Sequence, residues 1–100
     1  MGAGLIAPTT IPPPRRTWSD AEWERLRKGP VRDDWVGVLV GDRLELSRSG
    51  RAIYGARFRR ELTGWKIVAA EVEGDPTRNR PERPERESER LQFLIERLLG

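Results

Sequence analysis

The chain has 100 residues, of which 36% are hydrophobic and 35% are charged, and its formal net charge is +3. A chain of this length forms one small domain, which excludes a cofactor domain joined to a separate substrate domain. Cysteine and histidine are both absent, which excludes disulfides, thiolate nucleophiles, cysteine or histidine metal sites and histidine proton relays.

The basic residues are mostly arginine: 17 of the 19 are Arg, and only Lys28 and Lys66 are lysine. Arginine suits the recognition of phosphate and carboxylate groups, because its guanidinium donates two parallel hydrogen bonds. The codons of a GC-rich genome also favour arginine along a whole chain. Since 16 acidic residues accompany the basic ones, the excess of +3 does not by itself indicate a nucleic-acid-binding protein.

Residues 1–16 are predicted to form a disordered proline-rich arm, in which Pro12, Pro13 and Pro14 favour polyproline II. The arm is either a mobile tail or a ligand for a proline-recognising domain. Its basic residues follow its apolar stretch, whereas a secretory signal has the reverse order. No apolar run approaches the roughly 20 residues of a membrane-spanning helix. We therefore expect a cytoplasmic protein without membrane association.

A short helix is predicted over residues 20–28. Ser19 and Glu22 form an S-x-x-E capping box, in which each side chain accepts a hydrogen bond from the other residue's backbone N–H. Trp18 and Trp23 fall at the two positions of a hydrophobic staple, which explains Trp18 without a binding role.

From Trp35 to Glu73 the hydrophobic pattern has the period of strands. Gly41 and Asp42 form a two-residue hairpin turn, and a looser turn follows at residues 48–51. The pattern predicts four antiparallel strands in meander order. They are WVGVLV at 35–40, RLELS at 43–47, AIYGARFRR at 52–60 and WKIVAAEVEG at 65–74.

A loop rich in Pro, Arg and Glu is predicted at about residues 75–85, and a C-terminal helix follows it. Leu91, Leu94, Ile95 and Leu98 recur at the spacing of one helix face. This apolar stripe either covers the chain's own sheet or forms a dimer interface.

These elements predict an α+β fold for the single domain at 17–100. It contains a short N-terminal helix, a four-stranded antiparallel meander and a C-terminal amphipathic helix packed on one sheet face. The alternative is a small barrel in which the strands close and the last helix acts as a plug.

The region from Trp35 onward resembles a family of small bacterial proteins of uncharacterised function. The shared motifs are an L-x-L-x-R-S hairpin at 44–49, an I-Y-x-x-x-F strand at 53–58, a W-K-I-V strand at 65–68 and an F-L-I-x-x-L-L helix at 93–99. In that family the R-S step usually continues W-T-G, whereas here Gly50 follows Ser49 directly. The resemblance implies an α+β fold and assigns no catalytic residue.

The remaining chemistry does not indicate an enzyme. Acid–base catalysis would require a carboxylate pair across a cleft, and a sheet with two helices offers little concavity. Ser47 and Ser49 lie beside Arg48, but the chain has no histidine to act as their base. No glycine-rich phosphate loop is present. We expect no catalytic residue, no metal and no cofactor.

The candidate binding residues lie on the predicted outward sheet face. If Tyr54 and Phe58 face the core, period-2 alternation places Arg57 and Arg59 outward. Arginines beside an aromatic ring would suit single-stranded nucleic acid, with phosphates on the cations and bases on the ring. A charged face also protects a sheet from aggregation. The candidates are Arg43, Arg57, Arg59 and Trp65 on the face, with Arg48, Ser49 and Arg51 at the hairpin turn.

These observations predict a small non-enzymatic interaction protein. It would bind an unknown protein partner through its sheet face or associate with itself as a homodimer. The alternative is a nucleic-acid-binding module that uses the same arginine-rich face.

Overall fold

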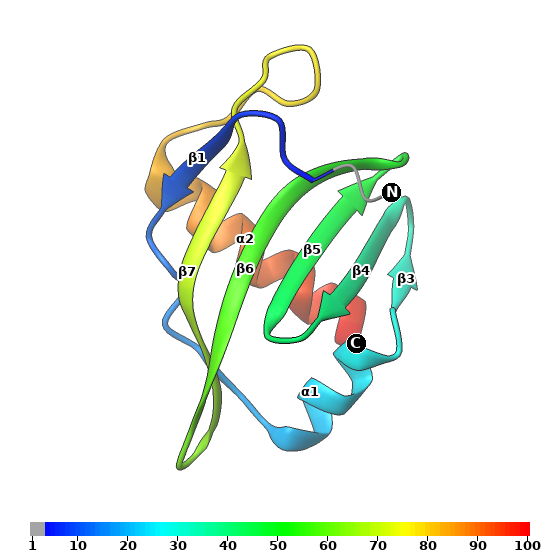
Figure 1. Cartoon of the computed structure of the whole chain (residues 1–100), viewed down its shortest axis with the longest axis vertical. Coiled ribbons are helices and arrows are strands. Elements are labelled where there is room, and N and C mark those ends of the chain that lie inside the picture. Colours follow the sequence, from blue (N-terminus) through cyan, green and yellow to red (C-terminus); the bar gives the residue numbers. More distant parts are fainter. Residues whose placement is uncertain (1–3) are drawn as a thin grey trace.

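The computed structural model describes residues 4–100 as an α+β fold with one antiparallel sheet and two helices. The strands are β1 (Pro8–Ile11), β2 (Thr17–Trp18), β3 (Val31–Arg32), β4 (Trp35–Val40), β5 (Arg43–Arg48), β6 (Arg51–Glu61) and β7 (Gly64–Glu73); the helices are α1 (Asp20–Arg27) and α2 (Pro84–Leu99). The sheet has seven strands in the order β1-β7-β6-β5-β4-β3, and β2 also pairs with β7. In Figure 1, α2 passes behind the sheet and α1 lies below the β4–β5 hairpin.

The four predicted strands are β4 to β7, and consecutive members pair in antiparallel fashion. A four-stranded sheet was nevertheless wrong, because β1, β2 and β3 extend it at both edges. The sheet is also open rather than a barrel. The added strands have two to four residues each, which is too short to show a two-residue period.

The proline-rich arm is not disordered along the part that the structure describes. Residues 8–11 form β1 and pair with residues 70–73 of β7, and Ile11 is buried in the core. Chain order also differs from the prediction, because β1 and β2 both precede α1. The sequence gives no sign of this docking, since β1 obtains its hydrogen bonds from a strand about 60 residues away. Residues 1–3 of the predicted arm lie outside the described residues.

Glu73 attaches the start of this segment to the sheet. Its buried carboxylate accepts hydrogen bonds from the backbone N–H groups of Ile6, at 2.8 Å, and Ala7, at 2.7 Å. Burial by itself raises the pKa of Glu73, but the backbone N–H donors outweigh burial and the net pKa is lowered. The ionised form of Glu73 therefore stabilises the docked arm.

Loss of this carboxylate should destabilise the fold in a pH-dependent way. Because the folded pKa lies below the unfolded value of about 4.3, the stabilisation is complete above that value. It is lost as the pH falls through the lower folded pKa. Chemical denaturation should show Glu73→Gln less stable than the wild type at pH 7, with the difference shrinking below about pH 4. A difference independent of pH would contradict this role.

The hairpin turns explain the strand register. Gly41 and Asp42 join β4 to β5, so that Val40 pairs with Arg43 as predicted. The turn at 48–51 is tighter than predicted: Arg48 pairs with Arg51 across two residues, Ser49 and Gly50. Both central residues have positive φ, 52° and 77°, which is the geometry of a two-residue turn that matches strand twist.

The inner face of the sheet carries the core and is covered by α1 and α2. The capping box of α1 is confirmed, because Ser19 and Glu22 each accept the other's backbone N–H. Trp23 of α1 stacks on Trp65 of β7, with ring centroids 3.8 Å apart. Trp18, predicted as a staple for Trp23, is fully buried in β2 and pairs with Trp65 in the strand register.

Helix α2 begins at Pro84, so the predicted loop ends earlier than residue 85. Proline is tolerated there because the first helical N–H has no partner inside the helix. Glu87 in the first turn is 1% exposed and accepts hydrogen bonds from the Tyr54 hydroxyl and the Glu82 backbone N–H. The structure makes it a buried link between α2 and β6.

The apolar stripe of α2 covers the chain's own sheet. Leu94 and Ile95 are buried as predicted, together with Leu91 and Leu99. Phe93 of the same helix lies outside this buried stripe and is 55% exposed.

Removal of a core side chain from α2 should destabilise the protein strongly. Leu94→Ala should cost about 2–4 kcal/mol, since it removes buried methyl groups and leaves a cavity. Phe93→Ala, one residue away on the exposed side, should change stability by less than about 0.5 kcal/mol. Denaturant unfolding of the two variants measures both values, and equal stabilities would show that the helix is packed differently.

Candidate functional site

The outer sheet face is the side of the sheet that points away from α1 and α2. One row of this face crosses four strands: Val40 pairs with Arg43, Arg43 with Arg57, and Arg57 with Ala69. The burial pattern agrees with the predicted faces, because Tyr54 and Phe58 are buried on the inner side and Arg57 is exposed. Period-2 alternation therefore placed the outward arginines of β6 correctly.

Strict alternation along β6 would place Ile53 beside these arginines, but Ile53 belongs to the buried core cluster. Ile53 is buried because the pairing of β5 with β6 shifts between Leu46 and Ser47, which leaves Ile53 as an extra residue in β6. A β-bulge of this kind interrupts the alternation of faces.

Arg43 is exposed on the outer sheet face and forms an ion pair. Its Nη2 lies 3.0 Å from Oε1 of Glu71, two strands away. The side chain lies flat over Gly55, and a Cβ at that position would collide with the guanidinium. Glycine therefore leaves room for the Arg43 side chain across β6, and Glu71 neutralises the cation.

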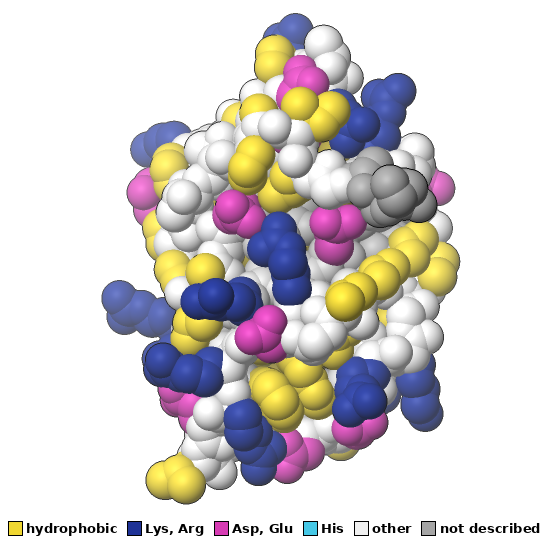
Figure 2. All heavy atoms as spheres, viewed as in Figure 1, with side chains coloured by type: hydrophobic (Ala, Val, Ile, Leu, Met, Phe, Trp, Pro, Cys, Tyr) yellow, Lys and Arg dark blue, Asp and Glu magenta, His cyan; other side chains and the backbone are white. Residues whose placement is uncertain are grey.

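The other cations of this face gather at one corner, which we call the basic corner: Arg15, Arg57, Arg59 and Lys66. Arg59 pairs directly with Lys66 across β6 and β7. Arg59 also forms an ion pair with Glu61 at 3.0 Å. Among residues 4–100, the other three members of the corner form no ion pair. Figure 2 shows Lys and Arg side chains gathered over the lower left of the sheet face.

Sequence reasoning missed two members of this corner. Arg15 was assigned to the disordered arm, and Lys66 was treated only as part of a strand. Lys66 could have been found, because it pairs with Arg59 once the β6–β7 turn is placed at Leu62 and Thr63. Arg15 could not, since its position depends on the pairing of β1 and β2 with β7.

Trp65 was predicted as a possible outward neighbour of the arginines, and this placement was wrong. Its ring lies on the inner face, stacked against Trp23, and its indole Nε1–H donates to Asp20 Oδ1 at 3.1 Å. Glu61 pairs with Gly64 across the turn, which places Trp65 on the same side as the buried Ile67. The outer face therefore lacks the aromatic ring that the nucleic-acid hypothesis placed there.

An apolar strip lies beside the cations and was not predicted as a site. Val36, Val38 and Val40 alternate on the outer side of β4, and we call them the valine strip. Val36 is half-buried, whereas Val38 and Val40 are 46% and 73% exposed. A band of hydrophobic side chains crosses the right side of Figure 2 over β4. Strand alternation places these three valines on one face with Arg43, but they were not among the predicted site residues.

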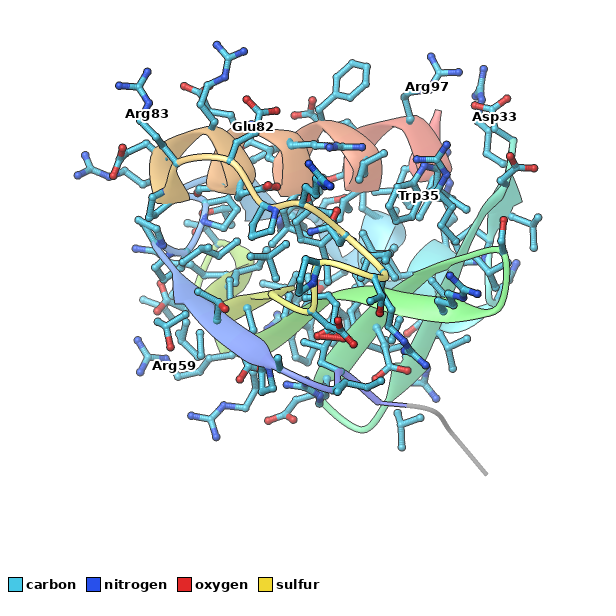
Figure 3. All side chains as sticks on the ribbon, turned by 90° about the horizontal axis from the view of Figure 1, so that it is seen from above. Asp33, Trp35, Arg59, Glu82, Arg83 and Arg97 are labelled. Carbon is cyan, nitrogen blue, oxygen red and sulfur yellow. The ribbon has the colours of Figure 1, made fainter. Side chains whose placement is uncertain are left out.

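The hairpin-turn candidates are separate from the basic corner. Arg48 lies with its guanidinium 5.9 Å from the Trp35 ring centroid, and both line a pocket of about 310 Å³ beside α2. Ser49 and Arg51 are exposed and do not line this pocket. Figure 3 shows Trp35 near the C-terminal end of α2 with Asp33 and Arg97, while Arg59 points away from α2 on the opposite side. Arg97 and Asp33 form an ion pair at 2.9 Å.

Comparison of the chain with protein-family models, with curated proteins and with solved structures gave no match. The resemblance to a small bacterial family therefore stays a prediction. Within residues 4–100, no group of three metal-ligating side chains is placed to hold an ion. Neither helix in that part of the chain is long and apolar enough to cross a membrane.

The two faces should respond differently to mutation. Trp65→Ala should destabilise the protein by about 2–4 kcal/mol, because it removes a large, partly buried ring that stacks on Trp23 and packs against the core. Arg59→Ala should change stability by less than about 0.5 kcal/mol, as exposed substitutions do. Thermal melts of both variants test the assignment, and a large loss with Arg59→Ala would mean that the faces are reversed.

Proposed function

We propose that this protein is a non-enzymatic interaction protein whose outer sheet face binds an acidic, partly apolar segment of a protein partner. The observation that carries this proposal is the composition of the face: an exposed valine strip lies beside a basic corner with unpaired cations. Valines supply apolar area, and cations outside ion pairs remain available for the carboxylates of a partner.

The arrangement of the face favours a protein segment over a second copy of the same chain. A partner that carries both acidic and apolar side chains can cover the basic corner and the valine strip together. A second copy offers the same cations, and juxtaposed like charges oppose association. The proposal keeps the cytoplasmic location that the sequence predicts.

The nucleic-acid alternative depended on an aromatic ring beside the arginines of the outer face, and Trp65 does not lie there. Single-stranded binding without sequence preference combines cations with aromatic rings on which bases stack. Trp65, Tyr54 and Phe58 are all packed on the inner face. The basic corner retains only phosphate contacts for a nucleic acid, which would make binding weak and steeply dependent on salt.

A synthetic peptide that alternates Glu with Val tests the proposal. Titration of ¹⁵N-labelled protein should shift the amide resonances of Val38, Val40 and Arg57 and leave those of α2 unchanged. Arg57→Gln should weaken binding about threefold or more, because it removes an unpaired cation from the contact surface. The matched control is Arg80→Gln, which should bind like the wild type. Arg80 is an exposed arginine of the 75–83 loop and forms no ion pair among residues 4–100.

Three results would overturn the proposal. One is the absence of any shift on the outer sheet face with the Glu–Val peptide. Another is equal binding of a peptide in which Lys replaces Glu. The third is tighter binding of a single-stranded DNA oligonucleotide, with affinity that falls steeply as salt rises. If the free protein sediments as a dimer and its contact surface maps to the valine strip, that strip would instead be assigned to self-association.

A further inference from the structure

A pocket of about 430 Å³ lies at the edge of β7, within the basic corner. We call it the β7-edge pocket; its lining residues are Pro13, Pro14, Arg15, Arg59, Lys66, Ile67 and Val68. The volume falls in the range of ligand-binding pockets, about 300–1,000 Å³. The residues come from the segment between β1 and β2, from β6 and from β7, so tertiary structure alone brings them together.

The pocket exists because two short strands share one edge of β7. Strand β1 pairs with residues 70–73 and β2 pairs with residues 65 and 66. Residues 67–69 therefore have no strand partner on that edge. The chain passes this stretch as Pro12, Pro13 and Pro14, which have no backbone N–H and cannot continue the pairing.

Three cations converge on this pocket without enough negative charge. Arg59 and Lys66 lie directly opposite each other on neighbouring strands, an arrangement of like charges that costs stability. Arg15 adds a third cation from the proline segment. Among residues 4–100, the carboxylate that pairs with one of these cations is Glu61, whose Oε2 lies 3.0 Å from Arg59 Nη2. Three positive charges against one negative charge leave a local net charge of +2.

The local net charge of +2 matches the charge of a phosphate monoester better than the single negative charge of a carboxylate. A phosphorylated side chain carries about −1.5 to −2 charge at pH 7 and three acceptor oxygens. Guanidinium groups bind phosphate through paired hydrogen bonds, and lysine adds a mobile point charge. Pro13, Pro14 and Val68 supply an apolar wall for a residue next to the phosphate.

From these contacts we propose that the β7-edge pocket binds the phosphate of a phosphorylated serine or threonine in the protein partner. This inference rests on the proposed function, because the phosphate belongs to the same acidic segment that covers the outer sheet face. The unphosphorylated part of the segment contacts the valine strip and Arg57. The phosphate group contacts Arg15, Arg59 and Lys66.

Two peptides of one sequence test the inference: an alternating Glu–Val peptide with one central serine, and the same peptide with phosphoserine. Phosphorylation should tighten binding to the full chain by at least about tenfold, a free-energy difference of about 1.4 kcal/mol. The phosphopeptide should also shift the amide resonances of Ile67 and Val68, which the plain peptide should leave unchanged. Inorganic phosphate alone should shift the same two resonances at millimolar concentration.

The variants separate the pocket from the rest of the face. Arg15→Gln combined with Lys66→Gln should remove the tenfold gain, so that this variant binds the phosphopeptide no more tightly than it binds the plain peptide. Arg57→Gln should weaken both peptides and retain the gain. Arg80→Gln is the matched control and should change neither affinity. A spectrum with the wild-type dispersion confirms that each variant is folded, and retention of the gain in the double variant would overturn the pocket assignment.

The remaining outcomes distinguish this inference from the proposed function. Equal binding of the two peptides overturns the phosphate inference and leaves the proposed function intact. Binding of neither peptide overturns both. A response to inorganic phosphate without a response to the phosphopeptide overturns the partner assignment. An equal response to sulfate and phosphate, with no gain from phosphoserine, reduces the pocket to a site of general anion attraction.

Discussion

The backbone N–H and C=O groups along both edges of β7 need hydrogen-bond partners, and much of the structure depends on which segments supply them. One edge pairs with β6, and the other pairs with two separate pieces of the N-terminal segment. Prolines between those pieces prevent one continuous strand. The two paired pieces place Ile11 and Trp18 in the core. Within residues 4–100, the proline interruption leaves residues 67–69 without a strand partner on this edge, beside Arg15 and Lys66. Edge pairing therefore produces both stability and the candidate pocket.

The division of the sheet into two faces determines which chemistry is available to a ligand. The large aromatic side chains of β6 and β7 pack inward beneath α1 and α2, so the outer face offers valines and cations without stacking surfaces. Gly55 has no side chain, and this leaves room for Arg43 to extend across β6 and pair with Glu71. One cation is thereby neutralised, and the free positive charge is confined to the basic corner.

A buried polar contact between Tyr54 and Glu87 joins α2 to the inner face of the sheet. The buried Glu87 carboxylate accepts the Tyr54 hydroxyl, and burial together with this neighbouring carboxylate raises the pKa of Tyr54. Tyr54 therefore stays protonated and continues to donate. A buried carboxylate is costly unless hydrogen bonds satisfy it, so this pair also helps to fix the position of α2 over the sheet.

Local patterns determined the parts of this protein that depend on neighbours in the chain. The capping box of α1, the register across Gly41 and Asp42, the apolar stripe of α2 and the outward position of Arg57 and Arg59 were all predictable. Tertiary structure decided the rest. The side of the sheet on which Trp65 lies depends on the turn at Leu62 and Thr63. Strand β1 pairs with a strand about 60 residues later in the chain, and Arg15 lies near Lys66 only because of that pairing. Those contacts join distant segments, and no local period or motif encodes them.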